Sequence, residues 1–162
     1  MKISREKLIQ LTKSVFEIPM KELGYLYNND FVGTGWDFAF VKQSKNSDIF
    51  FMINMQPEGF SAIDLFDMTV NFLRCNNLDG QIDLTRTSSM SCFLIRITTC
   101  LQYLGYGIKK DLWWHFLNEE EAITGLQDML DKIIIYGIPF LEDSNTNFNI
   151  VMKDVYKKFN SD

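Results

Sequence analysis

The sequence WDFAFVKQSKNSDIFFMINMQ, residues 36–56, contains two runs of aromatic and β-branched residues that are separated by a short polar linker. Runs of this composition favour β-strands, and the linker QSKNSD is typical of the turn between two strands. Side chains along a strand alternate between two faces, and in both runs each face carries apolar residues. We therefore predict a β-hairpin in the interior of an antiparallel sheet rather than at its edge.

Two further segments are predicted to extend this sheet. The run MSCFLIRIT, residues 90–98, alternates so that Phe93, Ile95 and Ile97 share one face while Arg96 points the other way. Residues 60–75 are ambiguous between helix and strand, because their apolar residues fit helical spacing as well as strand alternation. We expect a loop and then a strand there, which gives a sheet of about four strands.

A helix is predicted before the hairpin. Ser4 is a suitable N-cap, and apolar residues recur after it at helical spacing. Pro19 is expected to open a short second turn that ends at Gly24. The predicted apolar stripe consists of Leu8, Leu11, Val15 and Ile18.

The last third of the chain is predicted to be helical. Asn118 and Glu121 resemble a capping box at the start of a long helix with one apolar stripe, which we expect to stop at Gly137. A final helix is predicted over residues 148–159. The chain is thus predicted to be one α+β domain, residues 1–162, with N-terminal and C-terminal helices packed on an antiparallel sheet.

Composition points to a soluble protein of the cytoplasm. The first residues lack the apolar stretch of a signal peptide, and the longest apolar runs are far shorter than the roughly 20 residues of a membrane helix. The three cysteines are odd in number and have no CxxC spacing. We therefore expect buried free thiols rather than disulfides or a zinc site.

Charge is distributed unevenly along the chain. The net charge is −5, with eight acidic residues and one basic residue between positions 111 and 143, against five acidic and seven basic residues between positions 1 and 45. Nucleic acids and anionic membranes require a basic stripe, which this sequence does not supply. We expect neither as a partner, whereas a basic protein partner suits the acidic last third.

The stretch KKDLWWHFLNEEE, residues 109–121, most invites a functional interpretation. Glu119, Glu120 and Glu121 fall in the first turn of the predicted helix, where the helix dipole stabilises carboxylates, so a structural role accounts for them. Trp113 and Trp114 are adjacent and face opposite ways in an extended chain. We expect one of them in the core and the other free to act as an aromatic anchor, and these five residues form the candidate binding surface.

His115 is the only histidine of the chain. No nucleophile motif surrounds any of the three cysteines, and one histidine without clustered ligands does not make a metal site. We therefore assign no catalytic residue, no metal site and no cofactor. The alternative is a small-ligand or enzymatic pocket between sheet and helices, with Arg96 and His115 as polar groups and Trp36 as an apolar wall.

Several motifs together resemble a bacterial family of small α+β domains of unknown function. They are KELGY, WDFAFVK, IFFMINMQ, FLIRIT, DLWWHF and YGIPFLED, and the resemblance spans roughly residues 21–143. The chain departs from the family in its unusually apolar hairpin and in the segment GFSAIDLF. The resemblance implies the fold and implies no activity and no catalytic residue.

The sequence thus favours a non-enzymatic protein-interaction module of the bacterial cytoplasm that neutralises or regulates a partner. The pocket of Arg96 and His115 remains the alternative. Pairing between copies through exposed strand edges also stays open, so the sequence leaves the oligomeric state undetermined.

Overall fold

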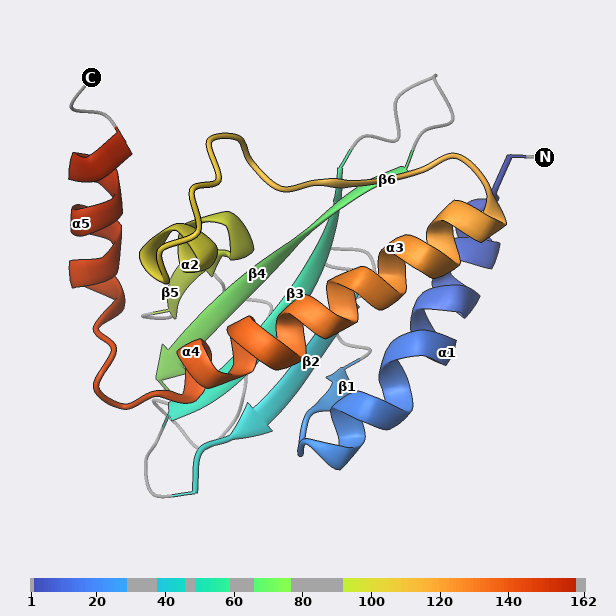
Figure 1. Cartoon of the computed structure of the whole chain (residues 1–162). Helices are drawn as coiled ribbons and strands as arrows, with labels where there is room; N and C mark the ends of the chain where they lie inside the picture. The colour runs from blue at the N-terminus through green and yellow to red at the C-terminus, as the bar shows by residue number, and fades with distance from the viewer. Residues whose placement is uncertain (1, 29–37, 46–48, 59–65, 77–91, 160–162) are drawn as a thin grey trace.

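The computed structural model describes residues 2–28, 38–45, 49–58, 66–76 and 92–159. The described residues form an antiparallel sheet with helices packed against one of its faces (Figure 1). The α+β prediction is confirmed, although the sheet has six strands rather than about four. Among the described helices, none combines the length and the apolar character that crossing a bilayer demands.

The strands run in the order β1-β2-β3-β4-β5, and β6 also pairs with β4. Their bounds are β1 Leu26–Asn28, β2 Phe38–Gln43, β3 Ile49–Glu58, β4 Phe66–Asn76, β5 Cys92–Arg96 and β6 Trp114–Phe116. The predicted hairpin is β2–β3, with Phe38 opposite Met55 and Gln43 opposite Phe50. It lies inside the sheet, as predicted, because β1 flanks β2 and β4 flanks β3. Trp36 lies outside the described residues.

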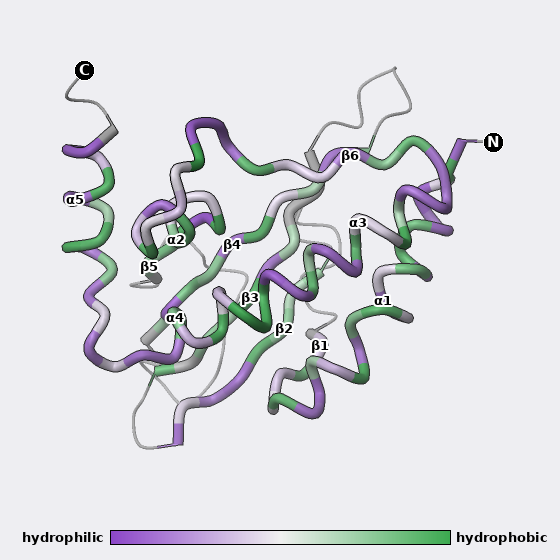
Figure 2. The backbone as a smooth tube through the Cα atoms, viewed as in Figure 1, coloured by the Kyte–Doolittle hydropathy of each residue, from purple (hydrophilic) through white to green (hydrophobic). Residues whose placement is uncertain are grey.

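The helices are α1 Arg5–Glu22, α2 Ile97–Tyr103, α3 Glu119–Lys132, α4 Ile138–Glu142 and α5 Phe148–Phe159. A π-helical turn, Ile133–Gly137, joins α3 to α4 without a break. Figure 1 shows α1 and α3 side by side across one face of the sheet, with α5 at the opposite side of the molecule from the N-terminus. In Figure 2 the trace of α3 alternates between hydrophilic and hydrophobic colours, as expected for a helix with one buried side.

The predicted start and end of the first helix are confirmed, but its course is different. The Ser4 side chain accepts a hydrogen bond from the Lys7 amide, and Gly24 ends the helix with a φ of 86°. The helix passes through Pro19 rather than restarting there. Its buried stripe is Leu8, Thr12, Phe16 and Met20, so the predicted Ile18 is 69% exposed. The aromatic ring of Phe16, which stacks on Phe40 at 6.2 Å, sets this rotation of the helix.

The long helix begins as predicted and continues further than predicted. The Asn118 side chain accepts a hydrogen bond from the Glu121 amide at 2.9 Å, and the Glu121 carboxylate accepts one from the Leu117 amide at 3.1 Å. Gly137 does not stop the helix, because the π-helical turn leads directly into α4. A Cβ built on Gly137 would lie 2.2 Å from the Phe72 ring, so this glycine allows a close approach of helix and sheet.

The structure describes residues 66–75 and 92–98 of the two segments predicted to extend the sheet. β4 confirms the strand predicted at the end of the first segment, while residues 59–65 lie outside the described chain. In the second segment the strand ends at Arg96, and Ile97 already belongs to α2. Ile95 and Ile97 are both buried, whereas Phe93, which was predicted for the same face, is 45% exposed. The change of backbone conformation after Arg96 was not predicted.

The prediction of buried free thiols is confirmed for Cys100 and wrong for Cys75. Cys75 is disulfide-bonded, and its Cα partner in the β4–β5 register is Cys92. Cys100 is free and buried, and burial raises the pKa of its thiol to about 12. The spacing of cysteines along the chain could not reveal which residues the sheet register places opposite each other.

Arg74 links the segment between α4 and α5 to the sheet. From β4 its guanidinium donates hydrogen bonds to four backbone carbonyls, and it lies 4.3 Å from the centre of the Phe148 ring. The accepting carbonyls belong to Phe140, Leu141, Asp143 and Thr146. The planar fork of arginine suits several acceptors at once, so this side chain places the start of α5 beside β5.

Replacing Gly137 with alanine should destabilise the domain. In an ordinary helix this change is favourable, but here the new methyl group would overlap the Phe72 ring. We expect the free energy of unfolding in urea to fall by about 1–3 kcal/mol, the usual cost of overpacking. Gly107→Ala is the matched control, because no atom lies within 4 Å of its added Cβ. Equal stabilities of the two variants would show that the helix does not press on the sheet at this point.

Candidate functional site

The two tryptophans occupy different environments, as the sequence predicted. Trp114 is buried in β6, and its indole N–H donates to Asp128 Oδ2 of α3 at 2.9 Å. Trp113 is half-buried, and the Arg96 guanidinium lies 5.5 Å from the centre of its ring. Trp114 is therefore the core residue of the pair, and Trp113 is the one that stays partly accessible to solvent.

Asp128 links Trp114 to the outer side of α3. Burial raises the pKa of this carboxyl, but hydrogen bonds from Lys132 and Trp114 and the charge of Lys132 together lower it below its ordinary value. The carboxylate form is thus the one that suits this position. The indole bond links β6 to α3.

The three glutamates at the start of α3 have separate roles. Glu121 completes the cap described above, and Glu119 forms an ion pair with Lys7 of α1 at 2.9 Å. Among the described residues, no hydrogen bond or ion pair of Glu120 is found, and its side chain is exposed. We name the surface of Glu119, Glu120 and Glu121 the acidic cap.

Two hollows flank the acidic cap, and Glu120 and Asn118 line both of them. The first, of about 560 Å³, lies beside β6 and is lined by His115, Asn118, Glu120, Glu121, Thr124 and Gly125. The second, of about 530 Å³, lies beside the N-terminus and is lined by Lys2, Ile3, Ser4, Lys7, Asn118, Glu119 and Glu120. A ridge with an exposed carboxylate between two hollows can receive a cationic side chain from a partner.

His115 lies beside a carboxylate that the sequence did not indicate. Its Nδ1 is 2.6 Å from Asp67 Oδ1 of β4, because the two residues are direct partners in the β4–β6 register. The imidazole is 65% exposed. A carboxylate on one ring nitrogen orients the ring and leaves the other nitrogen open to solvent or to a ligand.

Arg96 lies on the same face of the sheet as His115. Side chains of Asp67 and Asn71, which are four residues apart on β4, point to one face, and their direct partners are His115 and Arg96. The two positions are roughly 13 Å apart along the strand. We use the name polar stripe for the row formed by Asp67, Thr69 and Asn71 of β4 together with their neighbours His115 and Arg96.

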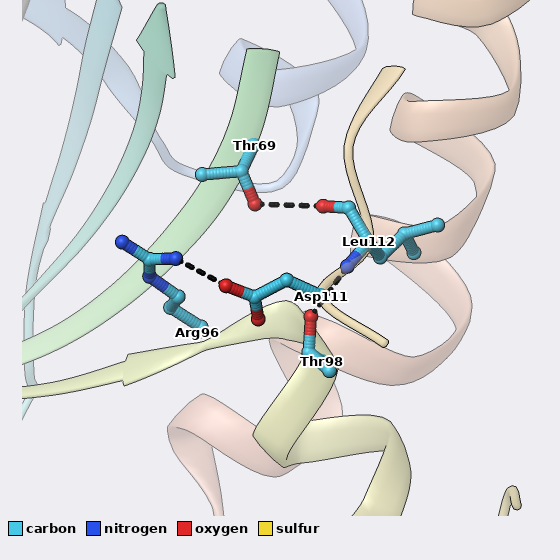
Figure 3. A network of polar contacts seen from close by, with 5 residues as sticks. All are labelled: Thr69, Arg96, Thr98, Asp111 and Leu112. Atoms are coloured by element: carbon cyan, nitrogen blue, oxygen red, sulfur yellow. Dashed lines mark hydrogen bonds and ion pairs between the residues drawn. The ribbon is translucent and has the colours of Figure 1, made fainter. Parts of the chain in front are cut away.

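Hydrogen bonds and an ion pair link the polar stripe to the segment that precedes β6 (Figure 3). Arg96 forms an ion pair with Asp111, and the Thr69 hydroxyl donates to the Leu112 carbonyl at 2.9 Å. The Leu112 amide in turn donates to the Thr98 hydroxyl at 2.8 Å. These bonds attach the segment before β6 to β4, β5 and α2 and thereby place Trp113 beside Arg96.

Two buried asparagines continue the polar stripe into the sheet. Asn71 Nδ2 donates to Asn54 Oδ1 at 3.2 Å, and both side chains are fully buried. Buried amides are retained only where hydrogen bonds compensate their loss of water. From Phe66 to Phe72 polar residues alternate with apolar ones, at Asp67, Thr69 and Asn71, and this alternation is the sequence signal that could have predicted the stripe.

The described residues offer little for covalent or metal chemistry. Cys75 is held in a disulfide, and the raised pKa of Cys100 keeps its thiol protonated at neutral pH. Within the described segments, no group of three or more histidine, cysteine or acidic side chains is placed to bind a metal ion.

Comparisons of the chain with family models, with curated proteins and with solved structures find no match.

The tryptophan assignment can be tested by fluorescence quenching with acrylamide. Trp114→Phe retains the half-buried Trp113, whereas Trp113→Phe retains the buried Trp114. The quenching constant should therefore be larger in Trp114→Phe than in Trp113→Phe. Trp36 is present in both variants and contributes to both. A larger constant for Trp113→Phe would remove Trp113 as the accessible anchor.

Proposed function

We propose that this domain is a non-enzymatic protein-binding module whose acidic cap, with Trp113 and His115 nearby, receives a basic segment of a partner protein and neutralises or regulates that partner. The observation that carries the proposal is Glu120, an exposed carboxylate that lines the hollows on both sides of the helix start. Since Glu119 and Glu121 are engaged in the fold, Glu120 is the group available to a cation.

Electrostatics support a basic partner. The N-terminal end of a helix adds positive potential and Lys7 pairs with Glu119, so the negative charge offered to a partner comes from Glu120 and Glu121. Complementary charge raises association rates and suppresses wrong partners more than it raises affinity. We therefore propose an interaction that salt weakens.

We further propose a bacterial cytoplasmic location, on the basis of the sequence alone. The disulfide at Cys75 counts against that part of the proposal, because disulfides are rare in reducing compartments. The interaction itself does not depend on the location, since Cys75 belongs to β4 and not to the acidic cap.

The test is a quantitative pull-down from lysate of the native cells at low and moderate salt. A bound protein should be near-stoichiometric, basic and salt-sensitive, and Glu120→Lys should weaken its binding about tenfold because like charges then meet. Glu17→Lys on the exposed side of α1 is the matched control, with the same charge change at a distant site. An equal loss of binding in both variants would show that only the net charge matters. Unchanged binding in Glu120→Lys would show that the acidic cap is not the binding site.

A second function is a small-ligand site that uses Arg96 and His115. The pocket was predicted between sheet and helices, whereas the β4 register places both residues on the opposite face of the sheet. The observation that favours it is their common face of the sheet, since opposite faces would have excluded any shared ligand. Because the two positions are roughly 13 Å apart along the strand, the guanidinium and the imidazole suit a ligand with a carboxylate or phosphate group at each of two points. A ligand of this kind should raise the melting temperature of the native protein and not that of Arg96→Gln. If panels of carboxylates and phosphates leave both melting temperatures unchanged, the pocket is not a site for such anions.

A further inference from the structure

A third hollow lies at the far end of the helical layer from the acidic cap. It has a volume of about 460 Å³ and is formed by the end of α2, the π-helical turn, α4 and the segment that follows α4. Its lining residues are Tyr103, Leu104, Tyr106, Ile135, Tyr136, Pro139, Phe140, Asp143 and Thr146. We name it the tyrosine hollow, and the proposed function does not use it.

The aromatic rings of the tyrosine hollow are held in fixed positions. The Tyr103 ring meets Phe140 edge-on at 5.9 Å, and the Tyr106 ring meets Tyr136 edge-on at 5.1 Å. A hydrogen bond between the hydroxyls of Tyr106 and Tyr136 is the main cause that raises the pKa of Tyr106. Tyr103 and Tyr106 are nevertheless each 45% exposed, so rigid rings are presented to solvent.

The backbone turns on the two sides of the tyrosine hollow direct its side chains toward solvent. After α2 the chain reverses at Gly105, whose φ is 96°, and the amides of Gly105 and Tyr106 bond back to the carbonyls of Gln102 and Leu101. On the other side, the π-helical turn leaves Ile135 60% exposed beside Tyr136. Such turns carry an energetic cost and recur at functional sites.

The chemistry of the lining identifies an occupant. Shallow aromatic surfaces recognise polyproline II segments, whose proline rings stack on tyrosines and whose carbonyls, free of internal hydrogen bonds, accept from hydroxyls. An added β-strand would instead require a sheet edge, and this hollow is walled by helix side chains. Asp143 is the acidic group of the lining. Its exposed carboxylate accepts from the Asn145 amide and the Thr146 hydroxyl, and its charge favours a basic residue beside the prolines.

We propose that the tyrosine hollow binds a proline-rich segment of a partner protein, in the polyproline II conformation, with a lysine or arginine next to its prolines. Tyr103, Tyr106 and Tyr136 form the stacking surface, and Asp143 receives the basic residue. This site is separate from the acidic cap, so either can operate without the other.

The test uses synthetic decapeptides that carry two prolines in Pro-x-x-Pro spacing and an arginine at one flank. Matched sets replace either the prolines with alanine or the arginine with glutamate, and binding to the full chain is measured by fluorescence anisotropy up to about 1 mM peptide. We expect peptides of the first set to bind and both replacements to weaken them about tenfold. No binding by the first set, or equal binding by all three, overturns the proposal.

Variants of the protein locate the peptide. Tyr106→Ala should weaken peptide binding about tenfold, while Tyr106→Phe, which keeps the ring and loses the hydroxyl, should weaken it less. Because Tyr106 is exposed, both variants are expected to fold, and their melting curves check this. Glu120→Lys should bind peptide like the native chain, which separates this site from the acidic cap. If Tyr106→Ala instead dissociates a dimer of the native protein in light scattering and leaves peptide binding intact, the hollow is a contact between copies and the proposal is wrong.

Discussion

The register between β3 and β4 is the constraint on which the rest of the structure depends. All ten residues of β3 pair with β4, so the register is fixed along the whole strand. It directs Val70 and Phe72 toward the helices and Thr69 and Asn71 to the opposite face. A slip of one residue would exchange the two sets. Burying two polar groups among the helices would then cost a few kcal/mol each unless new hydrogen bonds formed.

The sequence allowed prediction of the elements whose patterns are long and local. The hairpin, the capping box of α3 and the final helix each follow from adjacent residues, and each is present. The three-residue strands β1 and β6 were missed, because they exist only through pairing with β2 and β4. The stripe of α1 was misassigned for a related reason. Thr12 is buried there and satisfies its hydroxyl on the Leu8 carbonyl, so a polar residue occupies a core position that hydropathy alone gives to Leu11.

In the candidate site, too, some contacts could be predicted from the sequence and others could not. The position of Glu121 in the cap was predictable, since it bonds residues three and four positions away. The partners of His115 and Arg96 were not, because Asp67 is 48 residues from His115 and Asp111 is 15 residues from Arg96. Pairing of β4 with β5 and β6 brings these groups to one face. A sequence pattern can show that a strand carries alternating polar residues, but only the register shows which of them meet.

The acidic cap and the tyrosine hollow lie at opposite ends of one continuous helical segment, which runs from α3 through the π-helical turn to α4. The acidic cap lies at its start, fixed by Trp114 and the capping box, and the tyrosine hollow lies at its π-helical turn. Beneath that turn, Phe72 of β4 fills the space that a side chain at Gly137 would need. The π-helical turn thus packs against the sheet, whereas the acidic cap packs against β6 and α1. A change of packing at Phe72 would therefore move Tyr136 and alter the tyrosine hollow, while the electrostatics of the acidic cap would stay as they are.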